Sequence, residues 1–264
     1  LAASSLFDTA EFVPQQTILD CFHAVCSGQA EKAVVPLENS IEGTVSMTLD
    51  LLYDHDDIYI EAEAVLPIAH HLMVHPDNHK VEKIYSHPQA LAQTFNFRFQ
   101  HYRNTPAQEF SSTAASAKRV AEHPEENWAA IANDYAARLY GLKILHRDIQ
   151  DVAQNHTRFS IISRLPENTK RDLEKITRKT SLFVTLPDDH AGGLHQVLSV
   201  FAWRRMNLSK IESRTLKTGL GNYFFYINVD GDWNDLLYQN SVDELRSSVR
   251  FLGNYPEYLI SNYF

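Results

Sequence analysis

The stretch Val34–Leu52 reads VVPLENSIEGTVSMTLDLL and contains an apolar strand, a polar loop and the first turns of a helix in succession. The apolar run Ala33–Leu37 is typical of a buried strand, and the polar residues Glu38–Ser40 end it. Apolar side chains then recur at helical spacing, with Thr44 or Ser46 as the expected N-cap. A buried strand that ends in a polar loop before a helix is the repeating unit of α/β proteins.

The same alternation continues to about residue 162. Further strands are expected at Ile58–Leu66, Ile68–His75, Val81–Tyr85, Trp128–Ala132, Leu142–Leu145 and Arg158–Ile162. Helices are expected at Gln89–Tyr102, Ala114–Glu122 and Asn133–Leu139, the last closed by Gly141. This order predicts mainly parallel sheets with helices on both faces. Ligands of such sheets bind in the loops beyond the strand ends, which here are Glu38–Thr44, Ser86–Gln89, Ser111–Thr113 and Asn155–Arg158.

A different pattern follows the charged stretch Thr169–Lys179, which we interpret as a linker. Its elements alternate as strand, helix, strand, strand, helix and strand, expected at Thr180–Leu186, Gly193–Arg205, Leu208–Leu216, Tyr223–Val229, Trp233–Val249 and Tyr255–Ile260. The order β-α-β-β-α-β is that of the ferredoxin-like fold. We therefore expect two domains, residues 1–176 and 177–264, as a length of 264 residues suggests at about 150 residues per domain.

Charge is distributed unevenly along the chain. Lys and Arg number 24 against 33 Asp and Glu, a net charge of −9, and residues 178–264 hold nine of each sign. The acidic excess lies before residue 178, which argues against nucleic acid as a partner because phosphate recognition needs a basic face. A hydrophobic content of 44% predicts a packed core. No apolar run reaches the ~18–20 residues of a membrane span and no basic-then-apolar leader opens the chain, so we expect a cytosolic protein without membrane contact.

Cysteine and histidine spacing indicates neither a disulfide nor a metal site. Cys21 and Cys26 lie five positions apart in an expected helix, so their thiols diverge and are predicted to be free. Four histidines cluster in sequence, but no carboxylate or thiol recurs near them at a ligand spacing; they are His70, His71, His75 and His79. The motifs GxGxxG, GxxxxGK[ST], GxSxG and HExxH do not occur.

The segment Asn155–Phe159 joins a loop to a strand and offers three kinds of chemistry. The planar guanidinium of Arg158 suits a carboxylate, the Thr157 hydroxyl can donate to a leaving oxygen, and Phe159 supplies an apolar wall. The competing interpretation is a strand start with a surface arginine. For the other polar loops the competing interpretation is ordinary helix capping, but four such loops at one sheet edge favour an anionic ligand.

Several blocks together resemble a known family. They are VVPLENSIEGTVSMTLDLL (Val34–Leu52), SHPQALAQ (Ser86–Gln93), STAASA (Ser112–Ala117), AAIAN (Ala129–Asn133) and NHTRF (Asn155–Phe159). In this order they resemble the bacterial prephenate dehydratases, and GGLHQVLSVFAWRRMNLSKIESRT (Gly192–Thr215) resembles their regulatory ACT domain. The resemblance runs from about residue 10 to the end. The family usually opens with a strand and a Gly-Pro-x-Gly-Thr-Phe loop, which we expect this chain to lack. Thr215 also replaces a usual proline, which predicts an altered phenylalanine affinity.

The resemblance implies a two-lobed, periplasmic-binding-protein-like catalytic domain with lobe 1 at about 1–67 and 153–170 and lobe 2 at about 68–152. It implies decarboxylation and dehydration of prephenate to phenylpyruvate without metal or organic cofactor. Thr157 would donate to the leaving hydroxyl, Arg158 would hold a substrate carboxylate or the loop around it, and Phe159 would shape the ring pocket. The implied substrate-binding residues are Glu38, Asn39, Ser40, Gly43, Thr44, Ser86, His87, Gln89, Ala90, Ser112, Thr113 and Asn155.

The ACT resemblance implies feedback regulation by L-phenylalanine, bound where two ACT domains pair in a homodimer or homotetramer. The implied contacts are Gly192, Gly193, Leu194, His195, Asn207, Leu208, Glu212, Ser213 and Arg214. Two alternatives remain open from the sequence: an arogenate dehydratase, acting on the aminated analogue, and a non-catalytic module that binds a small anion or amino acid.

Overall fold

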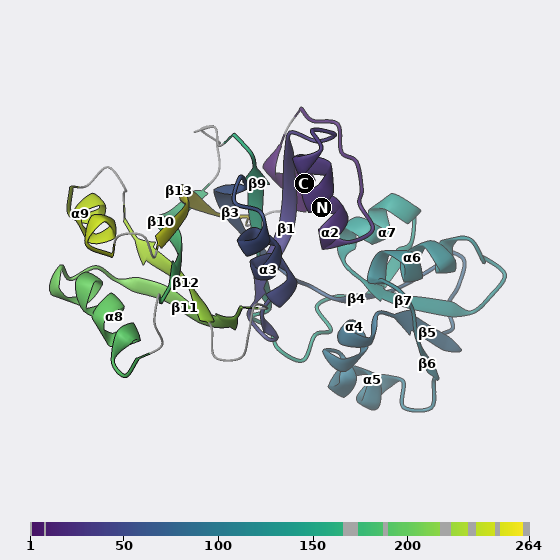
Figure 1. Cartoon of the computed structure of the whole chain (residues 1–264). Coiled ribbons are helices and arrows are strands. Elements are labelled where there is room, and N and C mark those ends of the chain that lie inside the picture. The colour runs from purple at the N-terminus through teal and green to yellow at the C-terminus, as the bar shows by residue number, and fades with distance from the viewer. Residues whose placement is uncertain are drawn as a thin grey trace. The chain divides into compact units, whose positions relative to one another are not determined.

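A computed structural model describes residues 2–7, 9–165, 174–186, 190–216, 223–231, 236–245 and 249–260. The chain forms two compact units, each described here by itself. The inserted unit comprises Pro67–His156, and the main unit comprises Ala2–Leu66 and Thr157–Asn262. Figure 1 labels most of the elements of both units.

The inserted unit is a five-stranded sheet covered by helices on both faces. Its strands are β4 (His71–Val74), β5 (Lys83–Ser86), β6 (Ala107–Glu109), β7 (Trp128–Ala132) and β8 (Lys143–His146). Its helices are α4 (Pro88–Ala92), α5 (Phe95–His101), α6 (Thr113–Ala121) and α7 (Asp134–Tyr140). In the strand order β6-β5-β7-β4-β8, β5 runs parallel to β6 and β7, and β4 runs antiparallel to β7 and β8.

Alternation along β7 explains the three layers of the inserted unit. Ala129 and Ile131 face one core, which Leu91 of α4 completes, whereas Ala130 faces a second core that includes Val120 of α6. Successive residues of a strand point to opposite faces of its sheet. A strand that is apolar at every position therefore requires a helical layer on each side.

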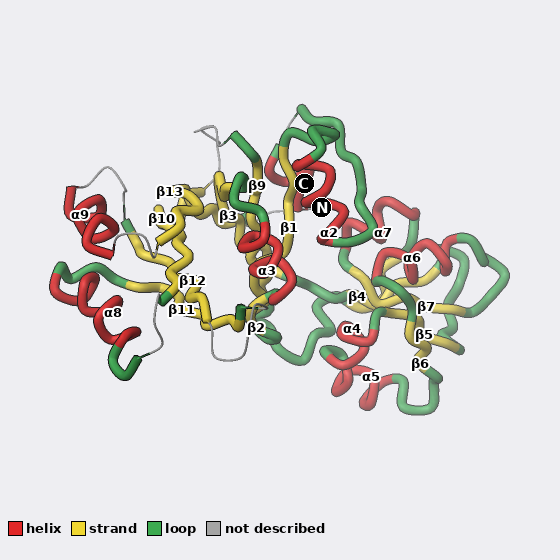
Figure 2. The backbone as a smooth tube through the Cα atoms, in the orientation of Figure 1, coloured by secondary structure: helices red, strands yellow, loops and turns green. Residues whose placement is uncertain are grey.

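The main unit is built around an eight-stranded sheet (Figure 2). Its elements before the inserted unit are α1 (Ala2–Leu6), α2 (Ile18–Cys26), β1 (Lys32–Asn39), β2 (Gly43–Thr44), α3 (Ser46–Asp54) and β3 (Tyr59–Pro67). Those after it are β9 (His156–Ser163), β10 (Glu174–Thr185), α8 (Gly193–Trp203), β11 (Leu208–Thr215), β12 (Tyr223–Asp230), α9 (Leu236–Leu245) and β13 (Val249–Leu259). The strand order is β11-β12-β10-β13-β3-β9-β1-β2.

The C-terminal elements have the predicted β-α-β-β-α-β order, and their strands pair antiparallel as β11-β12-β10-β13. One face of these strands packs against α8 through residues such as Val197 and Phe201. The opposite face contributes Phe183 and Tyr226 to the core that holds Phe22 of α2. Because β13 also pairs parallel with β3, the C-terminal strands share both a sheet and a core with the first part of the main unit.

The α/β class is confirmed, but the sheets are mixed rather than mainly parallel. The pairs β1–β9, β4–β7 and β4–β8 are antiparallel, because the chain crosses between units and returns instead of repeating one βαβ unit throughout. The short edge strand β6 was not expected; its three residues are all exposed and carry no apolar pattern.

Some predicted boundaries are wrong for local reasons. The expected helix Gln89–Tyr102 is two helices, separated where the Thr94 hydroxyl donates to the Ala90 carbonyl at 2.7 Å. The N-cap of α3 is Val45, without a side-chain cap, and neither Thr44 nor Ser46. Strand β10 begins at Glu174, inside the expected linker and ahead of the expected boundary at 176/177. The rest of that linker, residues 169–173, and residues 233–235 and 246–248 of the expected last helix lie outside the described residues.

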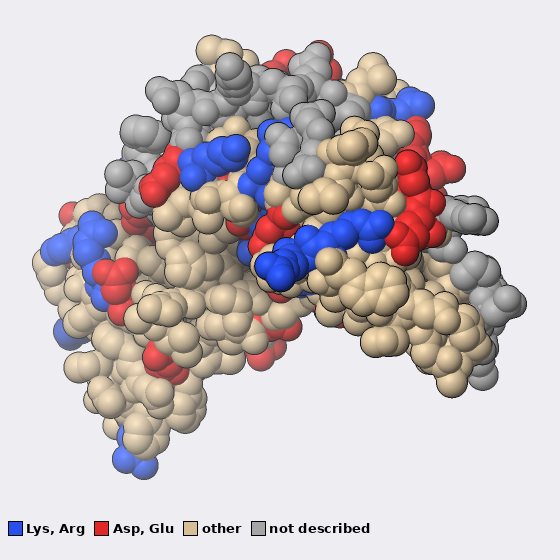
Figure 3. Space-filling model, turned by 90° about the vertical axis from the view of Figure 1, so that its left-hand side faces the viewer, with Lys and Arg blue, Asp and Glu red and all other residues tan. Residues whose placement is uncertain are grey.

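The charges on one face and the helix lengths can be described directly. The face drawn in Figure 3 carries basic and acidic side chains beside one another within a larger uncharged area. Within the described ranges, no helix is both long and apolar enough to span a bilayer.

Gly141 permits a test of the predicted helix end. It closes α7 at φ 65°, and a Cβ built there would meet no atom within 4 Å. Replacement by Ala should lower the free energy of unfolding by about 1 kcal/mol through backbone strain alone. Asn, which tolerates the left-handed region, should cost less. Urea denaturation measures both, and an Ala variant as stable as wild type would contradict the strain.

Candidate active site

The antiparallel pairing of β1 with β9 brings together two sequence blocks about 120 positions apart. Asn39 lies opposite Thr157, and Glu38 lies opposite Arg158. Strand β2 pairs with the other edge of β1, so Glu38 also lies opposite Thr44, and Asn39 lies opposite Gly43. The sheet thus places the predicted catalytic residues Thr157 and Arg158 beside four predicted substrate contacts, Glu38, Asn39, Gly43 and Thr44.

Asn39 donates a hydrogen bond to the Thr157 hydroxyl and thereby leaves the hydroxyl proton available. The buried Asn39 amide donates from Nδ2 to Thr157 Oγ1 at 2.9 Å. Its carbonyl oxygen accepts from the backbone N–H groups of Ile41 and Glu42 at 2.9 and 3.2 Å, which holds the amide in one orientation. Because the Thr157 oxygen accepts this bond, its own proton can be given to another group.

Arg158 is surrounded by carboxylates. Its Nε lies 2.8 Å from Glu257 Oε1 and 3.4 Å from Glu63 Oε2, and Nη1 contacts Glu38. Burial lowers the pKa of Arg158, but the combined effect of Glu63, Glu257 and Glu38, which raise it, is larger, so the net shift is upward. Arg158 therefore stays cationic and braces β9 against β1, β3 and β13. Half-buried Phe159 lies opposite Pro36 on the same strand pair.

The pKa of Glu63 is raised, and the largest cause is its complete burial. Lys179 and Arg158 act in the opposite direction: Lys179 Nζ lies 3.4 Å from Glu63 and 2.6 Å from Glu257. Two buried carboxylates, Glu63 and Glu257, thus share two cations, Arg158 and Lys179. This ionic cluster was not predicted, because its members come from four strands and form no sequence motif.

The segment proposed to bind phenylalanine contacts the loop after β1. Thr44 Oγ1 donates to Glu212 Oε2 at 3.1 Å and accepts from Lys210 Nζ at 2.7 Å. Arg214 lies 2.9 Å from Asp50. Burial alternates along β11, so Lys210, Glu212 and Arg214 share the covered face, whereas Ser213 is exposed.

The other predicted effector contacts lie at the start of α8 and of β11. Gly192 is the N-cap of α8 at φ 90°, and Gly193, Leu194 and His195 form its first turn. Asn207 donates from Nδ2 to Asp230 Oδ2 at 2.6 Å, and Leu208 begins β11.

The predicted site residues of the inserted unit mostly have structural contacts. The buried Ser86 hydroxyl donates to the Ile131 carbonyl at 2.6 Å. His87 caps α4 by accepting from the Gln89 N–H at 3.3 Å, and Ser112 caps α6 by accepting from the Ala115 N–H at 3.0 Å. Ala90 packs in the core, Thr113 is the first residue of α6, and in the main unit Ser40 is exposed beyond β1. Helix capping thus accounts for the bonds of His87 and Ser112.

A polar cluster in the inserted unit was missed at the sequence level. Gln93 Oε1 accepts from Asn155 Nδ2 at 3.0 Å and from His70 Nε2 at 2.9 Å. Gln93 Nε2 and His70 Nδ1 are buried without a hydrogen-bond partner among the described residues. Of the predicted site residues, only Asn155 belongs to this cluster; the signal for Gln93 was its place in the Ser86–Gln93 block, at the end of a short helix.

Comparison with known proteins decides the family. The model of the family described as prephenate dehydratase matches residues 1–167. The chain belongs to the prephenate dehydratase family. It is 46% identical over 270 residues to the prephenate dehydratase of Bacillus subtilis (strain 168), an alignment covering 98% of this chain and 94% of the relative.

Solved structures agree on the fold. The prephenate dehydratase of Arthrobacter aurescens in complex with L-phenylalanine has a TM-score of 0.80 at 36% identity, covering 92% of this chain and 80% of that one. GqqA, described as a novel type of quorum-quenching acylase, also has a TM-score of 0.80, at 29% identity, and covers 93% and 89% of the two chains. The prephenate dehydratase fold is thus shared with a protein described by another activity.

The buried histidines predict a pH dependence of stability. Burial, the main cause, lowers the pKa of His70 below its ordinary value. Below about pH 6.5, His70 of the unfolded chain therefore binds a proton, whereas the buried His70 of the folded chain stays neutral. The free energy of unfolding falls as the pH drops through that region. His70→Gln should reduce this slope, although His71, whose pKa burial also lowers, keeps part of it. Chemical denaturation between pH 5 and 8 measures the slope. The exposed His79→Gln is the control, and an unchanged slope in His70→Gln would refute the assignment.

Proposed function

We propose that this chain converts prephenate to phenylpyruvate, releasing CO₂ and water, and that L-phenylalanine regulates it. The observation that carries the catalytic part is the Asn39–Thr157 hydrogen bond at the β1–β9 edge. Membership of the prephenate dehydratase family supports the substrate. No step of the proposal draws on a metal or an organic cofactor.

The reaction breaks one C–O and one C–C bond and makes the ring aromatic. The hydroxyl leaves as water after gaining a proton, while the electrons of the bond to the departing carboxylate enter the ring and release CO₂. Thr157 is proposed to donate that proton and to regain one from water, with Asn39 holding the oxygen. Since aromatisation drives the bond breaking, the enzyme has only to orient the dianion and assist the leaving group.

Arg158 is proposed to act as a positioning residue. Its positive charge is already paired with the carboxylates of Glu38, Glu63 and Glu257, so it is not available to a substrate carboxylate. The same contacts hold β9 so that Thr157 stays opposite Asn39. This favours the second of the two predicted roles, support of the loop, over direct binding of a substrate carboxylate. Phe159 remains the proposed apolar wall of the ring pocket.

Short-range donors are proposed to bind the substrate. The net charge of −9 lies before residue 178, so the long-range field repels a dianion. In the main unit, Asn39, Ser40, Gly43 and Thr44 are the proposed contacts, with Glu38 supporting them. In the inserted unit they are His87, Gln89, Ala90, Ser112, Thr113 and Asn155, with Ser86 in a supporting role because its buried hydroxyl donates to the Ile131 carbonyl.

Thr157 provides the central test. Thr157→Val keeps the side-chain shape but removes the hydroxyl, so kcat should fall by about 10²–10⁴-fold, with KM little changed. Thr157→Ser keeps the hydroxyl and should retain most of the activity. Phenylpyruvate formation from prephenate is the measurement. Full turnover by the Val variant would remove Thr157 from the mechanism.

The wild-type protein separates the competing functions. Product formation is compared for prephenate and arogenate, and acyl release is assayed in parallel because one similar structure is described as an acylase. Turnover of arogenate alone would support the arogenate dehydratase, and binding of prephenate without turnover would support the non-catalytic module.

Regulation is proposed to act through the covered face of β11. Phenylalanine would bind near Gly192–His195, Asn207–Leu208 and Glu212–Arg214 in a homodimer or homotetramer, with residues 177–264 as the regulatory domain. Lys210, Glu212 and Arg214 contact Glu38, Thr44 and Asp50 in the same unit. A ligand that moves β11 would therefore alter the loop beside Thr157.

Arg214→Gln tests this coupling. Losing the bonds to Asp50 and Ser46 should raise the phenylalanine concentration for half-inhibition by about tenfold, within the usual range of coupling energies. Arg204→Gln is the matched control, because Arg204 pairs with Glu244 of α9 instead. Inhibition curves and light scattering of the same samples report regulation and oligomeric state. Equal curves for both variants would contradict the proposed route.

A further inference from the structure

An unexpected group of metal-binding side chains lies where α2 and α3 end. Cys26 is the last residue of α2, His55 follows α3, and Asp57 lies in the next turn. One ligand atom from each of the three lies within 4.8 Å of the other two. None of them takes part in the proposed reaction, and His55 is not one of the four histidines that cluster in the sequence.

The distance between the thiol and the imidazole fits coordination to one ion. Cys26 Sγ lies 3.6 Å from His55 Nδ1. For Zn–S and Zn–N bonds of about 2.3 and 2.0–2.1 Å at a tetrahedral angle, the two ligand atoms are about 3.6 Å apart. The ligands therefore need little rearrangement to share a metal ion, and thiolate, imidazole and carboxylate together form a set that zinc binds in proteins.

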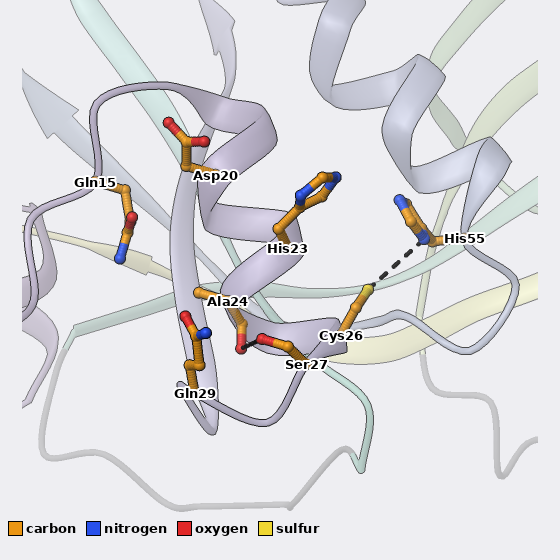
Figure 4. A pocket seen from close by; sticks show the side chains of 8 residues that line it. All are labelled: Gln15, Asp20, His23, Ala24, Cys26, Ser27, Gln29 and His55. Carbon is orange, nitrogen blue, oxygen red and sulfur yellow. Dashed lines mark hydrogen bonds between the residues drawn. The ribbon is translucent and has the colours of Figure 1, made fainter.

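Cys26 and His55 of this group line a pocket of about 650 Å³ (Figure 4). Figure 4 shows the side chains of Cys26 and His55 directed toward one another, and His23 lines the same pocket one helical turn before Cys26. The opening gives an ion access from solvent, and it leaves the fourth position of a tetrahedron to water.

Neighbouring groups hold the ligands in place. The His55 ring stacks on Phe22 with a centroid distance of 5.8 Å. The backbone of the same turn is fixed from β13, where Arg250 donates to the carbonyl oxygens of Tyr53, at 2.9 Å, and of His55. Contacts of this kind around a metal site orient its ligands.

We propose that Cys26, His55 and Asp57 form a site for a zinc-type divalent cation that ties the end of α2 to the turn after α3. Arg164 now pairs with Asp57 at 2.8 Å; its half-exposed side chain would release the carboxylate to the ion. The thiol would lose its proton to solvent on binding. A nucleophilic role for Cys26 is less favoured, because reactive cysteines have lowered pKa values, whereas burial and Asp57 raise the pKa of this thiol.

Cobalt titration of the intact, chelator-treated protein tests the proposal. Wild type should develop a sulfur-to-cobalt charge-transfer band that saturates at one equivalent and disappears when Zn²⁺ is added. Cys26→Ser should lose the band, and His55→Gln should bind at least tenfold more weakly. Cys21→Ser is the matched control, because Cys21 is the other half-buried thiol of α2 and lies outside the group; it should behave as wild type.

A second measurement covers the possibility that a variant fails to fold. In the wild-type protein, Zn²⁺ should slow alkylation of Cys26 by iodoacetamide, read from peptide masses, and leave that of Cys21 unchanged. It should also raise the thermal midpoint in proportion to binding. Absence of the band in wild type, an equal band in a folded Cys26→Ser variant, or unprotected Cys26 would each overturn the site.

Discussion

The antiparallel register of β1 and β9 is the constraint on which the candidate active site depends. Side chains alternate between the two faces of a sheet, so a slip of one residue would turn every side chain to the other face. Val35 and Leu37 of β1 and Ile162 of β9 are fully buried in one core, which makes such a slip costly. Val35 and Ile162 lie before a one-residue register shift between Pro36 and Glu38 of β1, and beyond this shift Asn39 lies opposite Thr157. The site therefore depends on the bulge as well as on the buried residues.

The same register creates an electrostatic problem beside the reacting group. Pairing Glu38 with Arg158 brings carboxylates close to a hydroxyl that is proposed to assist a dianion. Lys179, Arg158 and Lys210 offset these carboxylates at short range, so the cluster is compensated locally although the surrounding domain is acidic. Because unpaired buried charges are costly, removing one cation would disturb the strand alignment as well as the local charge. This is why a positioning role suits Arg158 better than that of an isolated anion receptor.

Sequence reasoning identified what depends on local pattern. Helix α7 and its Gly141 end, the β-α-β-β-α-β order and the strand Trp128–Ala132 all follow from periodicity and turn residues, and the structure has them. It failed where the deciding contact was distant. The break at Thr94 depends on a hydroxyl bonding the preceding turn, and the cluster of Glu63, Glu257 and Lys179 joins three separated strands. Spacing cannot reveal such contacts, because register and pairing partner are properties of the assembled sheet.

Regulation by phenylalanine requires more than contacts between β11 and the catalytic part of the main unit. Strand β11 contacts the loop after β1 through Lys210 and Glu212, and Thr44 bonds to both. These bonds transmit an effect only if phenylalanine binds two arrangements of β11 with different affinity, since a ligand shifts an equilibrium by no more than that difference. Lys210 pairs with Glu38, which in turn contacts Arg158. If a different arrangement of β11 moved Lys210 away, Glu38 would keep only its ion pair with Arg158, and that pair would become stronger. The stronger pair would shift Arg158 and, with it, the neighbouring Thr157. Inhibition would then lower turnover as well as substrate affinity.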